Sequence, residues 1–196
     1  MRYVGRMLGV GLTNDRPFAF YRLNSRSFPN RRAVIRGNEI YIANQTETDN
    51  PYVSYPVVKL LENYAVVSNG LQTVFIAQAL EEESPRKALI HVLDAFDYER
   101  DDYSTPRIAA IVECGKARGW LGFVGREELW VKAIKLEEGK AFFTATYNVD
   151  GIEELELSFS NAEELAEKVL RLEFAHPVLA IGVVEKENGW GLAISP

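Results

Sequence analysis

Residues 107–124, RIAAIVECGKARGWLGFV, decide the class of fold that we expect for this chain. Two runs rich in branched aliphatic and aromatic side chains, 107–112 and 118–124, are separated by a short turn that contains glycine and charged residues. This arrangement is typical of two neighbouring strands. Three further runs follow with similar turns between them, at 129–134, 140–148 and 152–159. Such closely spaced strands predict that this half of the chain forms an antiparallel meander.

Strand-like runs also occur elsewhere in the chain. Residues 3–12 and 18–23 are two such runs, separated by the turn-prone segment 13–17. Residues 64–68 form a short apolar run that ends at an Asn-Gly pair. Two further pairs of runs flank glycine-containing turns and predict hairpins, 33–35 with 39–43 and 177–185 with 190–194.

Three segments carry helical signals, 71–82, 84–96 and 160–171. The first has an apolar stripe at helical spacing. The second begins with Ser84, a good N-cap residue, followed by Pro85 at the first helical position. The third begins with a capping box formed by Ser160 and Glu163.

The segment between the first hairpin and residue 64 is ambiguous. Asn50 followed by Pro51 has the form of a helix start. Residues 52–56 then predict either a short helix that is kinked by Pro56 or a loop.

The balance of strands and helices predicts the layers of the fold. Roughly ten strands and three helices are best buried when two sheets pack together and the helices cover their outer faces. We therefore predict an α+β fold, a four-layer αββα sandwich of two antiparallel sheets between helices. No linker-like composition or repeat divides the chain, so we expect a single domain over residues 1–196.

The composition excludes several classes of function. The chain has 22 Lys and Arg against 28 Asp and Glu, and its net charge of −6 argues against general binding to nucleic acid or membrane surfaces. The single cysteine, Cys114, excludes an internal disulfide and favours a reducing compartment. We find no signal-peptide pattern and no apolar run near the roughly 18 residues that cross a bilayer. We expect a soluble, cytoplasmic protein.

Positive charge gathers in one early segment. Residues 16–37 contain no Asp or Glu, and after Arg16 they hold five arginines, Arg22, Arg26, Arg31, Arg32 and Arg36. Arginine presents a planar fork of donors that fits phosphate or carboxylate. The cluster therefore predicts an anion site. The alternative is a solvated edge with scattered surface arginines.

Acidic residues gather in a second segment. The polar loop 97–106 contains Glu99 and several aspartates and is followed by Arg107. An acid-rich loop between a helix and a strand is a plausible place for a general base. The alternative is a solvated connector, and Tyr55 and the pair Asn69-Gly70 are equally open between site and structural roles.

Metal and nucleophile chemistry have little support in the sequence. The only histidines, His91 and His176, lie far apart, and no Cys/His spacing matches a zinc site. We interpret His91 as a structural residue of its helix and leave a turn role and a site role open for His176. Cys114 has no neighbour that would activate it, and no phosphate-binding glycine motif occurs. We expect no metal and no cofactor.

Eight short motifs follow one another along nearly the whole chain: YR (21–22), SRSFPNR (25–31), NPYVSY (50–55), AVVSNG (65–70), DYE (97–99), TPRIAA (105–110), HPV (176–178) and GW (189–190). Their order resembles the archaeal-type IMP cyclohydrolases. That family shares its fold with the N-terminal-nucleophile hydrolases, which agrees with the layered fold predicted above. Those hydrolases use an N-terminal Cys, Ser or Thr, whereas this chain starts with Met1.

The resemblance implies an enzyme of purine biosynthesis. It would close 5-formamidoimidazole-4-carboxamide ribonucleotide (FAICAR) to inosine monophosphate (IMP), with loss of water, as a hydrolase-class enzyme acting in the ring-closing direction. The reaction is intramolecular, so positioning of the two reacting groups supplies much of the catalysis. It needs neither a metal nor a redox cofactor.

The resemblance also implies roles for individual residues. Tyr55 and Glu99 would be the catalytic proton-transfer pair. The substrate-binding residues would be Arg22, Arg26, Asn30, Arg31, Asn69, Gly70 and Arg107. Two alternatives remain: an amide hydrolase of the same fold with a nucleophile exposed by processing, and a non-enzymatic purine-nucleotide-binding protein.

The aromatic residues Trp120, Trp130 and Tyr147 would line either the core or the interface of a homo-oligomer.

Overall fold

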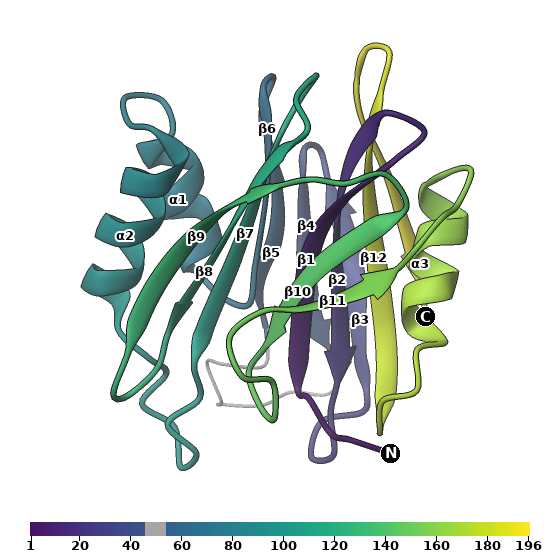
Figure 1. Ribbon diagram of the computed structural model, residues 1–196. Helices are drawn as coiled ribbons and strands as arrows, with labels where there is room; N and C mark the ends of the chain where they lie inside the picture. Colours follow the sequence, from purple (N-terminus) through teal and green to yellow (C-terminus); the bar gives the residue numbers. More distant parts are fainter. Residues whose placement is uncertain (46–53) are drawn as a thin grey trace.

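The computed structural model describes residues 1–45 and 54–196, and these form two antiparallel sheets packed face to face. Helices cover the outer face of each sheet, α1 and α2 on one side of the molecule and α3 on the other (Figure 1). The helices are α1 (Gln72–Ala79), α2 (Pro85–Phe96) and α3 (Ala162–Leu170). The predicted α+β sandwich is therefore confirmed.

The first sheet has six strands in the order β11-β10-β1-β2-β12-β13. The chain enters this sheet at its centre, because β1 and β2 form a hairpin that is flanked by strands from the C-terminal half. Its strands are β1 (Arg6–Thr13), β2 (Arg16–Asn24), β10 (Lys140–Ala145), β11 (Glu153–Glu156), β12 (Pro177–Lys186) and β13 (Gly189–Ser195).

The second sheet has seven strands that follow the order of the chain. Its strands are β3 (Arg31–Arg36), β4 (Glu39–Asn44), β5 (Tyr55–Leu60), β6 (Tyr64–Ser68), β7 (Arg107–Glu113), β8 (Arg118–Val124) and β9 (Leu129–Lys135). The hairpins expected around residues 36–38 and 186–189 are both present, as β3–β4 and β12–β13.

Three apolar clusters hold the layers together. One lies between the sheets and includes Leu8 and Tyr21 from the first sheet and Val67 from the second. A second joins α3 to the first sheet, and a third joins α1 and α2 to the second. Gly182 allows α3 to approach β12, because a Cβ at that position would lie 2.5 Å from the backbone carbonyl oxygen of Ala162.

The predicted helices are found, with a correction to the cap of α3. The N-cap is Asn161, whose Oδ1 accepts a hydrogen bond from the Glu164 nitrogen at 2.8 Å. The Ser160 nitrogen donates to Glu164 Oε2 at 2.8 Å. The reciprocal cap thus lies one residue later than the predicted pair of Ser160 and Glu163.

Two predictions about strands were wrong. The expected meander is broken after β9, because β10 and β11 join the other sheet. Tyr55 to Leu60 forms strand β5, not a kinked helix or a loop. Its proline, Pro56, lies opposite Tyr41 next to a register shift, because the pairing with β4 skips Val57 of β5. This is the kind of irregular position where a strand tolerates proline. The helix start expected at Asn50 and Pro51 lies outside the described residues.

Three further observations bear on predictions made from the sequence. His91 is exposed and its Nδ1 lies 2.9 Å from Glu83 Oε1, so it is a surface residue of α2 and not a core one. Within residues 1–45 and 54–196, no helix is long and apolar enough to cross a membrane. The same residues contain no group of three or more His, Cys, Asp or Glu side chains arranged to hold a metal ion.

Candidate functional site

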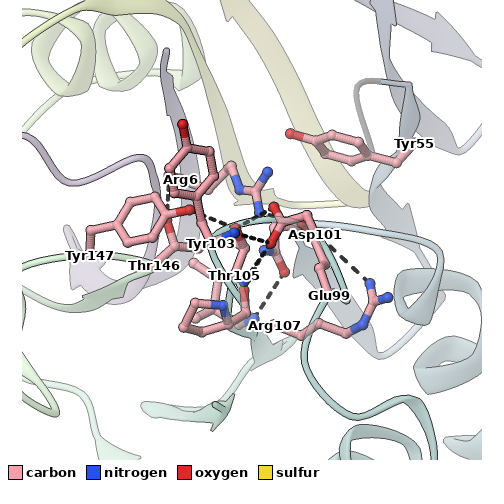
Figure 2. A network of polar contacts seen from close by, with 12 residues as sticks. Arg6, Tyr55, Glu99, Asp101, Tyr103, Thr105, Arg107, Thr146 and Tyr147 are labelled. Atoms are coloured by element: carbon pink, nitrogen blue, oxygen red, sulfur yellow. Dashed lines mark hydrogen bonds and ion pairs between the residues drawn. The ribbon is translucent and has the colours of Figure 1, made fainter. Parts of the chain in front are cut away.

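A buried carboxylate, Glu99, lies at the centre of a polar cluster between the ends of the two sheets (Figure 2). It follows α2, whose C-cap residue Asp97 has φ 58° and ψ −174°, a backbone conformation that glycine adopts much more readily than other residues. The Glu99 nitrogen then donates to the Thr105 carbonyl oxygen at 2.8 Å, which closes the loop. This local geometry turns the Glu99 side chain inward, and only 1% of its surface is exposed.

Two arginines flank this carboxylate. Arg6, on β1, donates from Nη2 to Glu99 Oε2 at 2.7 Å. Arg107, on β7, places Nη1 at 3.8 Å from Glu99 Oε1. Burial raises the pKa of Glu99 above its usual value, and the charges of the two arginines oppose that rise. The three side chains together carry a net charge of +1, which favours an anionic ligand nearby.

A pair of buried tyrosines faces the same region from the two sheets. Tyr21, on β2, and Tyr55, on β5, share a hydrogen bond of 2.7 Å between their hydroxyl oxygens. Burial and the neighbouring Tyr55 raise the pKa of Tyr21 well above its usual value. Tyr55 and Glu99 line a common cavity of about 260 Å³, together with Asn69, Gly70 and Arg107. The structure therefore brings five of the sequence-predicted site residues together.

The loop between β2 and β3 and the first residue of β3, residues 25–31, contribute two arginines to neighbouring cavities; we call this segment the arginine loop. Arg31 is buried, and its Nε donates to the Phe28 carbonyl oxygen at 3.1 Å. It lines a cavity of about 310 Å³ that also contains Arg6. Arg26 is exposed and lies over the Tyr3 ring, with Cζ 4.1 Å from the ring centroid. It lines an adjacent cavity of about 450 Å³.

The three cavities are linked through their lining residues. We call the cavity of Arg26 the outer cavity, the cavity of Arg31 the middle cavity and the cavity of Tyr55 the inner cavity. The outer and middle cavities share the lining residues Tyr3, Ser27, Tyr103 and Tyr147. Arg6 lines the middle cavity and is hydrogen-bonded to Glu99, which lines the inner one. The Arg6–Glu99 ion pair thus connects the wall of the cavity of Tyr55 to the wall of the middle cavity.

Asn69 and Gly70 shape the inner cavity, Asn69 through its side-chain hydrogen bonds and Gly70 through its lack of a side chain. Asn69 uses its whole amide: Nδ2 donates to the Pro106 carbonyl oxygen at 2.9 Å, and Oδ1 accepts from the Ile108 nitrogen at 2.9 Å. A Cβ at Gly70 would lie 2.8 Å from Arg107 Nη1 and closer still to Gln72 Oε1. Glycine at this position therefore allows Arg107 to reach Glu99.

Two residues expected at the site lie apart from these cavities. Arg22 is fully buried on the face of β2 that meets α3, and its guanidinium donates to the backbone oxygens of Val169, Leu172 and Phe174. Burial lowers the pKa of Arg22 to about 10. Its position makes it a structural residue at the end of α3. Asn30 is exposed and lines none of the three cavities.

The sequence predicted no site role for Arg6, Tyr21 and Tyr147, and it left Thr105 open between a site role and a structural one. Arg6 and Tyr21 contribute the ion pair and the second hydroxyl, and Thr105 and Tyr147 line the middle cavity. Tyr21 and Thr105 lie inside motifs noted above, which was the available signal. Arg6 had none, because its partner is 93 residues away in the chain.

The fold and the site define an α+β sandwich protein with a buried, positively charged polar site of the size of a small ligand. A family model described as "IMP cyclohydrolase-like protein" matches residues 3–189. The chain belongs to this IMP cyclohydrolase-like family.

Curated relatives agree with the family match. The chain is 71% identical to a protein of Thermococcus kodakarensis named "IMP cyclohydrolase", over 100% of this chain and 99% of the other. It is 40% identical to a protein of that name from Methanocaldococcus jannaschii, over 95% and 96% of the two chains. A third, from Methanothrix thermoacetophila, is 37% identical over 98% of each chain. The family expected from the short motifs is confirmed.

Proposed function

We propose that this protein is an IMP cyclohydrolase that closes FAICAR to IMP with loss of water. The observation that carries the proposal is the buried Glu99 carboxylate, held between Arg6 and Arg107 in a cavity that also contains Tyr55. The relatives named IMP cyclohydrolase, aligned over nearly their whole length, supply the reaction.

Ring closure first moves one proton: the carboxamide nitrogen attacks the formyl carbon and loses a proton, and the formyl oxygen becomes an oxyanion that gains a proton to give a cyclic hydroxyl intermediate. Water then leaves when this hydroxyl takes up a second proton and the former formamido nitrogen gives up its own as the C=N bond forms. The two tasks in the first step are removal of the proton from nitrogen and protonation of the oxyanion. A carboxylate with a raised pKa is a better base near neutral pH than an ordinary one. We assign the first task to Glu99, whose pKa is raised by burial. We assign the second to Tyr55, with Tyr21 as its hydrogen-bond partner.

Arg6 is suited to stabilise the oxyanion. It is buried beside Glu99, and its Nε has no hydrogen-bond partner among the described residues. An unpaired buried donor is costly unless a ligand satisfies it. A preorganised cation near developing negative charge is a strong contributor to catalysis in a site from which water is excluded.

The arginine loop is suited to bind the phosphate of the nucleotide. Arg26 lines the outer cavity and Arg31 the middle cavity. Ser25 and Ser27 lie beside them in the same loop and add hydroxyl groups to the cavity wall. The substrate would then extend from this loop toward Tyr55, with its reacting groups at Glu99.

The single, partly buried Cys114 supports a cytoplasmic location.

The proposal is tested by following IMP formation from FAICAR by ultraviolet absorbance with the purified protein. We expect turnover without added metal or cofactor. Binding of IMP without ring closure would instead identify a nucleotide-binding protein. Mass spectrometry of the active protein supplies a second check: loss of an N-terminal segment that exposes Cys, Ser or Thr would favour an amide hydrolase.

A further inference from the structure

Hydrogen bonds join Asp101, Thr105 and Tyr147 (Figure 2), and all three residues line the middle cavity. Thr105 Oγ1 lies 2.6 Å from Asp101 Oδ2 and 2.6 Å from the hydroxyl oxygen of Tyr147. Tyr147 comes from the segment after β10, whereas Thr105 and Asp101 belong to the loop that also carries Glu99. These hydrogen bonds thus link the two halves of the site.

The direction of these hydrogen bonds follows from counting protons. The carboxylate of Asp101 can only accept hydrogen bonds. Its Oδ1 also accepts hydrogen bonds from the backbone nitrogens of Tyr103, at 3.2 Å, and Thr105, at 2.9 Å. The single proton of the Thr105 hydroxyl therefore points to Asp101. Thr105 then has only lone pairs for Tyr147, so the proton of the Tyr147 hydroxyl must point to Thr105.

The phenol oxygen of Tyr147 is consequently fixed as an acceptor toward the cavity. Burial raises the pKa of Tyr147, so the hydroxyl keeps its proton at neutral pH and the count holds. The ring is also fixed, because it stacks on Tyr3 with centroids 5.9 Å apart. A side chain held in this way accepts a hydrogen bond from a ligand with little loss of entropy.

The position of Tyr147 identifies the part of the ligand that it meets. Tyr147 lines both the outer cavity, which contains Arg26, and the middle cavity, which contains Arg6, the partner of Glu99. In a nucleotide the ribose lies between the phosphate and the base. If the phosphate binds at the arginine loop and the base at Glu99, the ribose hydroxyls face the wall that contains Tyr147.

We propose that Tyr147, oriented by Thr105 and Asp101, accepts a hydrogen bond from a ribose hydroxyl and thereby selects ribonucleotides over deoxyribonucleotides. The inference rests on the proposed function, because it uses the direction in which the nucleotide is placed. Tyr147 is a specificity residue that contacts the ligand, and Thr105 is a positioning residue that acts through it.

The test is a comparison of IMP, 2′-deoxy-IMP and 3′-deoxy-IMP by titration calorimetry with the full chain. We expect the intact protein to bind IMP about 10-fold more tightly than one of the two deoxynucleotides, as one hydrogen bond is worth. In Tyr147→Phe the affinity for IMP should fall to that for the deoxynucleotide, whose own affinity should stay unchanged. A merely structural role would weaken all three ligands equally.

A second pair of variants tests the orienting role and serves if Tyr147→Phe does not fold. Thr105→Ser keeps the hydroxyl and should preserve the preference for IMP. Thr105→Val removes the acceptor of the Tyr147 proton and should reduce the preference. Equal binding of all three nucleotides by the intact protein would overturn the inference, as would a full preference in Thr105→Val. No binding of IMP at all would instead refute the proposed function.

Discussion

Replacing Glu99 with glutamine removes the proposed general base while changing the shape of the site very little. General base catalysis by a positioned group contributes about 10²–10⁴-fold to a rate. We therefore expect Glu99→Gln to lower kcat for IMP formation by about that factor. Product affinity should change little, because the amide keeps an oxygen that accepts the hydrogen bond from Arg6.

The same substitution has a cost in stability that the structure bounds. Breaking a buried ion pair by removing one partner typically costs about 3–5 kcal/mol. Here the raised pKa of Glu99 shows that its charged form is already penalised by burial, and glutamine relieves that penalty. We expect a loss of at most about 3 kcal/mol in the free energy of unfolding, less than the roughly 5–15 kcal/mol of a typical domain. The variant should remain folded.

A matched control uses an arginine–carboxylate pair on the surface. Glu167 lies 3.4 Å from Arg171 on the exposed side of α3. Glu167→Gln should leave both kcat and the denaturation midpoint unchanged, because exposed pairs contribute little. The ultraviolet assay for IMP formation measures the rates, and chemical denaturation measures the stabilities. If Glu99→Gln turned over at the rate of Glu167→Gln, the assignment of Glu99 as the base would be refuted.

Three further predictions follow from the same geometry. Arg31→Ala should raise the Kd for IMP about 10–100-fold, because the buried Arg31 would no longer make a charge-assisted hydrogen bond to the phosphate. Arg32→Ala, at the exposed neighbouring residue, should leave the Kd unchanged, and titration calorimetry measures both values. Because Glu99 must be ionised to act and its pKa is raised above the usual 4.5, kcat/KM should fall as pH drops through a midpoint above 4.5, and an acid limb at or below 4.5 would contradict this. Arg22→Met should lower the free energy of unfolding by about 1–3 kcal/mol, because backbone oxygens near the end of α3 lose their donor, but should retain affinity for IMP; a weakened affinity per folded molecule would return Arg22 to the site.

The layers of the fold were predictable because burial limits how strands and helices combine. What the sequence did not show was the choice of sheet for each strand. Nothing in residues 129–148 distinguishes β9, an edge strand, from β10, which crosses to the other sheet, since both are short runs with charged turns. Pro56 hid β5, because the strand tolerates proline only beside the irregular pairing with β4, in which Val57 has no opposite residue, and this long-range pairing leaves no signal in residues 52–56.

The site was predictable where its residues lie in distinctive local motifs. Glu99 and Arg107 stand out at the ends of an acid-rich loop, and the structure brings both beside Tyr55. Arg6 is different, because it lies in an apolar strand and becomes part of the site only through a long-range contact. Arg22 shows the converse: it lies in the same basic segment as Arg31, yet its donors serve the backbone at the end of α3.

The order of strands in the first sheet has a consequence for how the molecule folds. The hairpin of β1 and β2 lies in the middle of its sheet, but its neighbours β10 and β12 begin only at Lys140 and Pro177. Until those segments are in place, both edges of the hairpin carry unpaired backbone groups, which invite pairing with other chains. Pairing between such distant segments is also slow. A nascent or partly unfolded chain is therefore vulnerable to aggregation at this hairpin, and a chaperone that shields it would raise the yield of native protein.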